Sequence, residues 1–289
     1  MGKVAAIQMN SGHLVADNLA AADKLLREAK DLGAQIACLP ENFSFIGLQD
    51  ADKLAVAEAD GSGPIQDFLR DTARELNMWI LGGTTVIKGD SATRVSNASL
   101  LIDGDGKRVA RYDKIHLFDV TIPGREESYR ESTHVTPGRR VVVADTPVGK
   151  LGLSVCYDMR FPELYRELVA QGAEWLAMPA AFTVPTGRAH WETLLRARAI
   201  ENLCYVVAPA QAGTHSSGRE TYGDTLIVDY WGLVLSRRTK GSGVVMADID
   251  LVKQAETRAR FPALDNRRLD LHKPSVPDHS RAGTATVFA

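Results

Sequence analysis

The sequence has few cysteines, little net charge and no long apolar run. Its three cysteines are an odd number, too few for a disulfide framework, and no CxxC pair or His/Cys cluster indicates a zinc site. A net charge of −2 gives no reason to expect nucleic acid or an anionic membrane as a partner. No apolar stretch is long enough to span a bilayer, and residues 3–9 read as a strand rather than a targeting segment. These absences favour a cytoplasmic protein that binds no metal.

The composition is that of an ordinary globular chain, 45% hydrophobic and 24% charged over 289 residues. Strand-like and helix-like patterns alternate, which is typical of an α/β fold with helices outside and sheets inside. Apolar spacing predicts a short helix after residue 250 and longer helices at 17–32, 64–76, 161–171 and 188–203. Strands are expected at 3–9, 35–39, 78–87, 95–102, 107–113, 141–145, 150–156, 174–178, 204–210, 224–229, 233–238 and 244–250.

Local signals mark some of these boundaries. Asp17 is expected to cap the first helix and Gly33 to end it, while residues 103–106 (DGDG) predict a hairpin turn. Residues 115–140 are rich in proline, glycine and charge, and a connection of that length is typical of a functional loop. No repeat or linker divides the chain, so we expect one domain over residues 1–273. The tail, 274–289, is expected to be flexible or to dock on a partner subunit.

Cys156 is the most informative single residue. It ends an apolar, β-favouring run and precedes a proline-containing turn into a helix, and such a turn exposes a side chain beside free backbone N–H groups. That position suits a nucleophile, although a lone cysteine more often packs as a small hydrophobe. Cys38 and Cys204 lie inside strand-like runs, and we interpret both as core residues.

Two charged residues also follow predicted strands. Glu41 comes after strand 35–39 and Lys114 after strand 107–113. Because ligand sites in α/β folds collect outside the carboxyl ends of strands, these groups and Cys156 would meet at one sheet rim if their strands are neighbours. Taken singly, residues such as Glu41 and Lys114 are usually ordinary surface charges, and only their joint placement favours a site.

The motifs around these residues carry a family resemblance. Residues 39–43 (LPENF), 112–117 (YDKIHL) and 152–163 (GLSVCYDMRFPE) occur in this order, and the chain resembles the Nit branch of the nitrilase (carbon–nitrogen hydrolase) superfamily. The resemblance implies a four-layer α-β-β-α sandwich and a homodimer or a higher homo-oligomer. It also implies a hydrolase of linear amides that needs neither metal nor organic cofactor.

By that resemblance Cys156 is the nucleophile, Glu41 the general base and Lys114 the electrostatic stabiliser. The family's second glutamate aligns with Glu131, with Glu126 and Glu127 as nearby competitors. The backbone N–H of Tyr157 is a natural further donor to the oxyanion. Together these groups suit amide hydrolysis through a thioester with release of ammonia.

The expected substrate is the amide of a small carboxylated 2-oxo acid, with deaminated glutathione as the first choice. Arg160, Phe182 and Thr186 are the expected substrate-binding residues, and Arg188 is a further cationic candidate. The alternative for Arg160 is a structural ion pair, and for Arg188 a structural ion pair is the more frequent role. The alternatives are omega-amidase action on a smaller 2-oxo acid amide, a nitrilase, and a catalytically silent scaffold.

Overall fold

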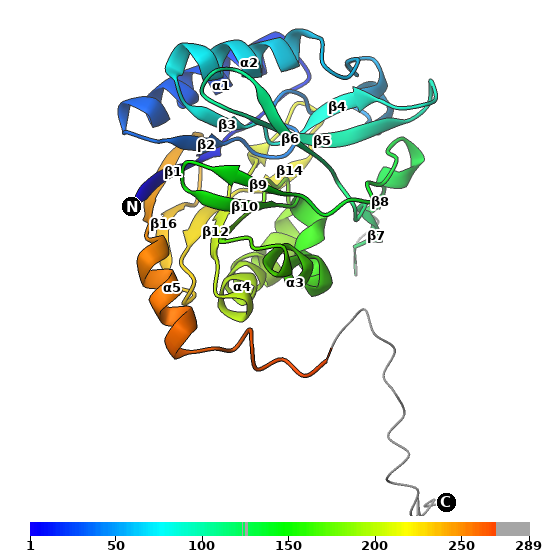
Figure 1. Ribbon diagram of the computed structural model, residues 1–289. Helices are drawn as coiled ribbons and strands as arrows, with labels where there is room; N and C mark the ends of the chain where they lie inside the picture. Colours follow the sequence, from blue (N-terminus) through cyan, green and yellow to red (C-terminus); the bar gives the residue numbers. More distant parts are fainter. Residues whose placement is uncertain (123, 125–126, 270–289) are drawn as a thin grey trace, which may run out of the picture.

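Two β-sheets stack face to face between two layers of helices in the computed structural model, which describes residues 1–122, 124 and 127–269 (Figure 1). The first sheet runs in the order β17 (Gly243–Ile249), β1 (Gly2–Gln8), β2 (Ile36–Cys38), β3 (Trp79–Leu81), β5 (Val95–Ile102), β4 (Thr85–Lys88), with β6 (Arg108–Asp113) also paired to β5. The second runs in the order β16 (Val234–Arg238), β15 (Thr225–Val228), β12 (Tyr205–Ala208), β11 (Trp175–Ala177), β10 (Gly149–Leu153), β9 (Val143–Thr146).

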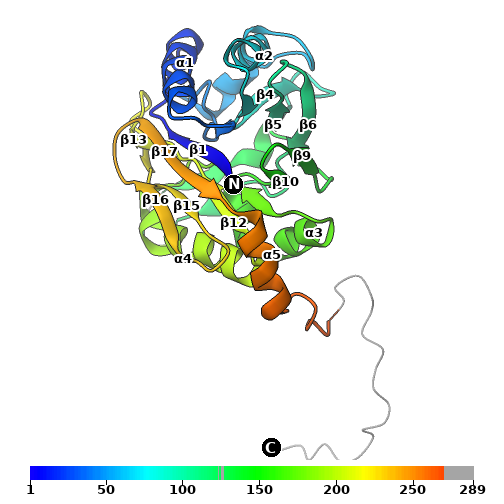
Figure 2. The ribbon, with the colours of Figure 1, turned by 60° about the vertical axis from the view of Figure 1, so that its left-hand side comes forward.

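Helices cover the outer face of each sheet. Figures 1 and 2 show α1 (Val15–Asp31) and α2 (Pro64–Leu76) on one side and α3 (Pro162–Ala170) and α4 (Val184–Asn202) on the other. The helix α5 (Leu251–Arg260) follows β17. The expected four-layer α-β-β-α sandwich is therefore confirmed.

The side chains of β1 point alternately into the two apolar cores on either side of the first sheet. Val4 and Ala6 belong to the core between the two sheets, whereas Ala5 and Ile7 belong to the core beneath α1 and α2. Successive side chains of a strand point to opposite faces. A strand buried on both faces is therefore apolar throughout, and this explains the continuous apolar run in the sequence.

Helix α2 and strand β5 occupy the predicted ranges, but α1 begins earlier than expected. It starts at Val15, and the residue before it makes no side-chain cap, so the assignment of Asp17 as N-cap is wrong. Asp17 lies in the first turn, where its carboxylate still interacts favourably with the helix dipole. Gly33 does end the helix, with a φ of 90° that glycine adopts at little cost.

Other boundaries also differ from the predictions. The expected strand 78–87 is two strands, because Gly82 and Gly83 interrupt it; β3 and β4 pair one after the other along the same side of β5, and β6 pairs with its other side. Helix α4 starts at Val184 rather than 188, with proline in its first turn. The hairpin of β13 (Ala212–Thr214) and β14 (Glu220–Tyr222) was not predicted.

The segment 115–140 contains more regular structure than its composition indicates. It forms the hairpin of β7 (Asp119–Thr121) and β8 (Ser128–Arg130), followed by a 3₁₀ turn over Glu131–Thr133. The same element type occurs at Asp50–Leu54 and at Cys156–Arg160. The predicted tail, 274–289, lies outside the described residues.

Gly83 provides a test of how tightly the chain before Glu41 is packed. A Cβ at Gly83 would lie 1.9 Å from the carbonyl oxygen of Pro40, at a φ of 40°, whereas a Cβ at Gly61 meets nothing within 4 Å at a φ of 88°. We expect Gly83→Ala to lower the free energy of unfolding by roughly 3 kcal/mol or more, and the control Gly61→Ala by roughly 1–2 kcal/mol. Urea titration measures both. Equal losses would contradict the close packing of Pro40 on Gly83.

Candidate active site

Cys156 lies at a sharp turn between β10 and α3. The strand ends at Leu153, three residues earlier than the cysteine, so Cys156 is not the last strand residue but the first of a 3₁₀ helix. Its φ is 51°, an uncommon conformation for a residue with a side chain. Its N–H donates to the carbonyl of Pro179 at 2.9 Å. Such strain persists only where the surrounding structure holds it, and it is concentrated at active sites.

Asp158 supplies much of that support and was not singled out in the sequence. Its fully buried carboxylate accepts hydrogen bonds from the N–H of Val155 at 2.8 Å, the hydroxyl of Tyr112 at 2.7 Å and the N–H of His116 at 3.0 Å. The turn at Cys156 in the second sheet is thereby hydrogen-bonded to β6 of the first sheet and to the segment that follows it. The only sequence signal is an acidic residue at the start of a helix, where carboxylates commonly accept N–H bonds.

Lys114 occupies the centre of the site between two carboxylates. Its Nζ lies 2.9 Å from Oε1 of Glu41 and 2.8 Å from Oε2 of Glu131, and its side chain is only 2% exposed. Glu131 also accepts from the N–H of Phe118 at 2.7 Å and from Nδ2 of Asn97 at 3.3 Å. The structure therefore brings Glu131, the candidate for the second glutamate, into direct contact with Lys114.

The other two candidates for that position differ from Glu131. Glu127 lies on a neighbouring, larger cavity and not on the one that contains Cys156. Glu126 lies outside the described residues.

The three predicted groups meet, but not on one sheet rim. Glu41 and Lys114 follow β2 and β6, which are separated in the first sheet by β3 and β5, and Cys156 follows β10 of the second sheet. The expectation of neighbouring strands is therefore wrong. The groups converge because the two sheets stack face to face and end together.

Charge and burial set the protonation of these groups. Burial opposes the charge of Lys114, yet Glu131 and Glu41 hold its pKa well above the ordinary value for lysine. Burial also works against the charge on Glu131, but Lys114 keeps the pKa of that carboxyl below its usual value. Burial and the carboxylate of Glu41 raise the pKa of the Cys156 thiol, while Lys114 lowers it. The resting site thus combines a protonated thiol with a lysine ammonium.

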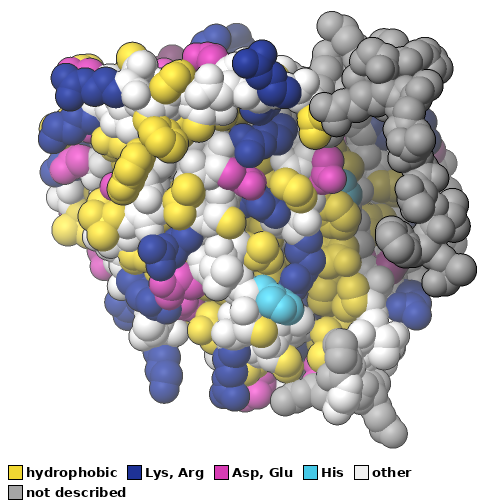
Figure 3. Space-filling view, turned by 90° about the horizontal axis from the view of Figure 1, so that it is seen from below, with side chains coloured by type: hydrophobic (Ala, Val, Ile, Leu, Met, Phe, Trp, Pro, Cys, Tyr) yellow, Lys and Arg dark blue, Asp and Glu magenta, His cyan; other side chains and the backbone are white. Residues whose placement is uncertain are grey.

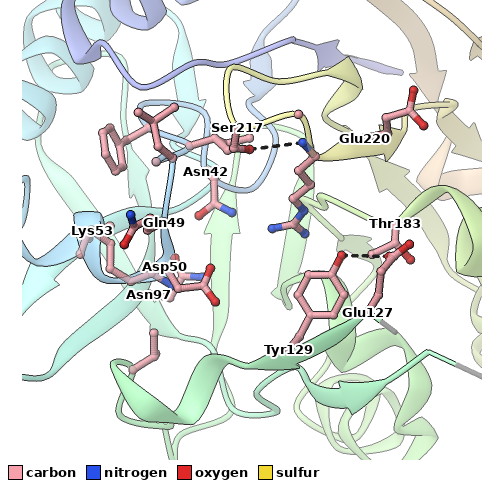
Figure 4. A pocket seen from close by; sticks show the side chains of 18 of the residues that line it. Asn42, Gln49, Asp50, Lys53, Asn97, Glu127, Tyr129, Thr183, Ser217 and Glu220 are labelled. Atoms are coloured by element: carbon pink, nitrogen blue, oxygen red, sulfur yellow. Dashed lines mark hydrogen bonds between the residues drawn. The ribbon is translucent and has the colours of Figure 1, made fainter. Parts of the chain in front are cut away.

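Glu41, Lys114, Glu131 and Cys156 line a cavity of about 70 Å³. It adjoins a larger cavity of about 510 Å³, part of which is shown in Figure 4. We call these the catalytic cavity and the outer cavity. Residues that line both cavities mark their junction: Asn42, Asp50, Lys53, Tyr129, Thr183 and Arg219.

The predicted substrate-binding residues divide between two locations. Phe182 and Thr186 line the catalytic cavity, as does Tyr157. Arg160 does not line it: its guanidinium lies over the rings of Tyr157 at 5.8 Å and Phe182 at 5.4 Å, behind the cavity wall. Arg188 lines a separate, third cavity.

Lys53 and Arg219 are the cationic residues at the junction of the two cavities, and sequence reasoning missed both. No motif marks them, because they lie in a 3₁₀ helix and a hairpin turn far apart in the chain. In the described part of the chain, no three His, Cys, Asp or Glu side chains are grouped to hold a metal ion. No helix among the described residues has the length and hydrophobicity required to cross a bilayer.

Comparisons with known proteins agree with this geometry. The carbon–nitrogen hydrolase family model matches residues 3–259. The chain belongs to the carbon–nitrogen hydrolase family. It is therefore a hydrolase acting on carbon–nitrogen bonds other than peptide bonds. It is 42% identical over 266 residues to the deaminated glutathione amidase of Yersinia enterocolitica, covering 92% of each chain.

Solved structures give the same assignment. The chain resembles the C. elegans NitFhit protein (TM-score 0.86, 41% identity), covering 92% of this chain and 65% of that longer one. It also resembles Saccharomyces cerevisiae Nit3, a member of branch 10 of the nitrilase superfamily (TM-score 0.83, 28% identity, 93% and 97% covered). A third structure is the amidase of Nesterenkonia sp. AN1 with acrylamide added to its active-site cysteine (TM-score 0.74, 25% identity, 91% and 98% covered).

The charges around Cys156 predict opposite shifts in two variants. Glu41→Gln removes a carboxylate that raises the pKa of the thiol, so the pKa should fall; Lys114→Met removes the ammonium that lowers it, so the pKa should rise. The pH midpoint of iodoacetamide alkylation at Cys156, followed by peptide mass spectrometry, should move down in the first variant and up in the second. Cys204, whose pKa burial raises to about 12, is the internal control and should stay unlabelled. Midpoints that do not move would contradict the assigned electrostatics.

Proposed function

We propose that this protein is a cysteine-dependent amidase that works through a thioester on Cys156. The observation that carries the proposal is the buried Lys114, bonded to Glu41 and Glu131 in the same cavity as Cys156. An ammonium, a carboxylate and a thiol in one small cavity match the three requirements of amide hydrolysis: charge stabilisation, proton transfer and nucleophilic attack. A scaffold protein has no physical need for this arrangement.

The first half-reaction follows from the protonation states. Because the pKa of Cys156 is raised, its proton must move to Glu41 as Sγ attacks the carbonyl carbon. The C=O electrons move onto oxygen, where Lys114 Nζ and the N–H of Tyr157 stabilise the negative charge; one such donor typically contributes on the order of 3 kcal/mol. The C–N bond then breaks, and the leaving nitrogen takes the proton from Glu41.

The second half-reaction regenerates the enzyme. Glu41 takes a proton from water as the water oxygen attacks the thioester carbonyl, and the sulfur leaves and recovers its proton. Glu131 holds Lys114 in place through its 2.8 Å contact and holds the segment after β6 through Phe118. No step requires a metal or an organic cofactor.

The substrate class that we propose is the amide of a carboxylated 2-oxo acid, with deaminated glutathione first. The name of the 42% identical relative and the outer cavity of about 510 Å³ beside the catalytic one both favour a substrate longer than a small carboxamide. Deaminated glutathione has only secondary amides, so its cleavage releases an amine, the dipeptide cysteinylglycine. The ammonia release expected from the sequence applies to primary carboxamides, the substrates of an omega-amidase.

We also propose that one catalytic domain extends from residue 1 to 273 and that the chain forms a homodimer. Apolar side chains from three elements are exposed and adjoining: Ile200 of α4 beside Gly232, Trp231 of the β15–β16 hairpin, and Phe261 after α5, whose ring lies 5.6 Å from that of Trp231. Figure 3 looks at the molecule from the side of α3 and α4 and shows hydrophobic side chains exposed among arginine and lysine. The three cysteines are free, which supports a cytoplasmic location.

Replacing the proposed nucleophile is the direct test. We expect Cys156→Ala to lower kcat/KM by at least about 1000-fold without loss of fold, because no other group can form the thioester. Cys204→Ala is the matched control and should stay within about threefold of wild type. Mass spectrometry of wild type mixed with amide should find an acyl adduct on Cys156. Turnover of the Cys156→Ala variant within about tenfold of wild type would exclude this mechanism.

A substrate panel distinguishes the alternatives. We expect deaminated glutathione to give the highest kcat/KM, ahead of 2-oxoglutaramate and a short aliphatic nitrile by at least about tenfold. Mass spectrometry follows cysteinylglycine from the first substrate, and an ammonia assay follows the other two. Preference for 2-oxoglutaramate would favour omega-amidase action, and preference for the nitrile would overturn the amidase proposal.

A further inference from the structure

Arg219 presents an unused donor at the junction of the two cavities. Its Nε is buried and has no hydrogen-bond partner among the described residues, while its Nη2 donates to the carbonyl of Ala181 at 3.2 Å. A buried donor without a partner costs free energy. Because Arg219 lines both cavities, a ligand that enters them can supply the missing acceptor.

The guanidinium is held in place before any ligand arrives. It lies over the ring of Tyr129 at 5.3 Å. The hairpin that carries it is fixed by His215, whose ring nitrogens contact the carbonyl oxygen of Ser11 at 2.8 Å and Oγ1 of Thr221 at 2.7 Å. A preorganised cation loses little entropy when an anion binds.

Lys53 adds a second cation at the same junction. It belongs to the 3₁₀ helix Asp50–Leu54, and its ammonium makes no hydrogen bond or ion pair with the described residues. Figure 4 shows Lys53 and Asp50 on one wall of the outer cavity and Tyr129 and Glu127 on the opposite one.

The balance of charge differs between the two cavities. The catalytic cavity is lined by four cationic residues, Lys53, Lys114, Arg130 and Arg219, and by three acidic ones, Glu41, Asp50 and Glu131. The outer cavity adds two acidic residues, Glu127 and Glu220, and no further cation among its lining residues in the described chain. An anionic group is therefore favoured at the junction and disfavoured farther out.

We propose that Lys53 and Arg219 form a carboxylate-binding subsite that selects amides carrying a carboxylate. This inference rests on the proposed amidase function and names residues that determine its substrate class. With the scissile carbonyl at Cys156, the carboxylate binds at the junction and the remainder of the substrate extends into the outer cavity. The carboxylate belongs to either the acyl part or the amine part of the amide, and both supply the same acceptor oxygens.

The test compares three amides in Arg219→Gln and Lys53→Gln. Glutaramate has a carboxylate on the acyl part, N-butyrylglycine has one on the amine part, and butyramide has none. Each variant removes a cationic donor to the substrate carboxylate, and hydrogen bonds to charged groups contribute strongly to binding. We therefore expect kcat/KM to fall about 10- to 100-fold, mainly through KM, for one of the two carboxylate-bearing amides. Butyramide should stay within about twofold. The substrate that loses activity identifies which part carries the bound carboxylate.

Two further variants serve as controls. Arg188→Gln removes an exposed arginine that lines a separate cavity and should leave all three substrates within about twofold. Arg219→Lys keeps the charge and should recover part of the loss. An equal loss on all three amides, or no loss on any, would overturn the subsite.

Binding separates this inference from the proposed function. Calorimetry with glutarate and with N-acetylglycine needs no turnover, and wild type should bind one of them at least about tenfold more tightly than either glutamine variant. Selective binding without hydrolysis of any amide would refute the amidase and keep the subsite. Hydrolysis with equal carboxylate affinity in all variants would refute the subsite and keep the amidase.

Discussion

The ion pairs of Lys114 are the interaction on which the site depends. A lysine that is 2% exposed can stay charged only if its partners offset the cost of removing it from water. Glu41 and Glu131 do so. Burial, together with the carboxylate of Glu41, raises the pKa of the Cys156 thiol and keeps it protonated at rest, although Lys114 acts in the opposite direction. In the mechanism that we propose, Cys156 therefore becomes reactive only when its proton moves and a substrate oxygen receives the charge.

This arrangement requires that two sheets keep a fixed relation to each other. Glu41 and Lys114 come from the first sheet and Cys156 from the second. Asp158 provides a direct polar link between them, since it accepts hydrogen bonds from Val155 on one side and from Tyr112 and His116 on the other. Burial of the apolar core between the sheets stabilises their packing against each other. Asp158, by contrast, fixes the orientation of the turn that carries Cys156.

The sequence predicts those features that depend on local order. The apolar stripe of α2 and the strand-like run of β5 place both elements at their observed bounds, and the three motifs place Glu41, Lys114 and Cys156 at or just after strand ends. It does not reveal which strands are neighbours, because pairing depends on contacts distant in the chain; hence the two-sheet origin of the site was missed. It also favoured Arg160 for its closeness to Cys156 in sequence, although the ring stacking of Arg160 on Tyr157 and Phe182 turns it away from the cavity lining.

The residues of the catalytic cavity and those at its junction with the outer cavity are held in place by different parts of the fold. The proposed cleavage step and the proposed substrate selection therefore depend on different segments of the chain. The proposed catalytic residues follow strands buried between packed layers, so their positions are fixed by the core. Lys53, Tyr129 and Arg219 come from a 3₁₀ helix and two hairpins at the surface. Such segments accept changes in sequence more readily than core strands do. A change in these segments can therefore alter which substrate is bound and leave the ion pairs of Lys114, and with them the cleavage step, intact.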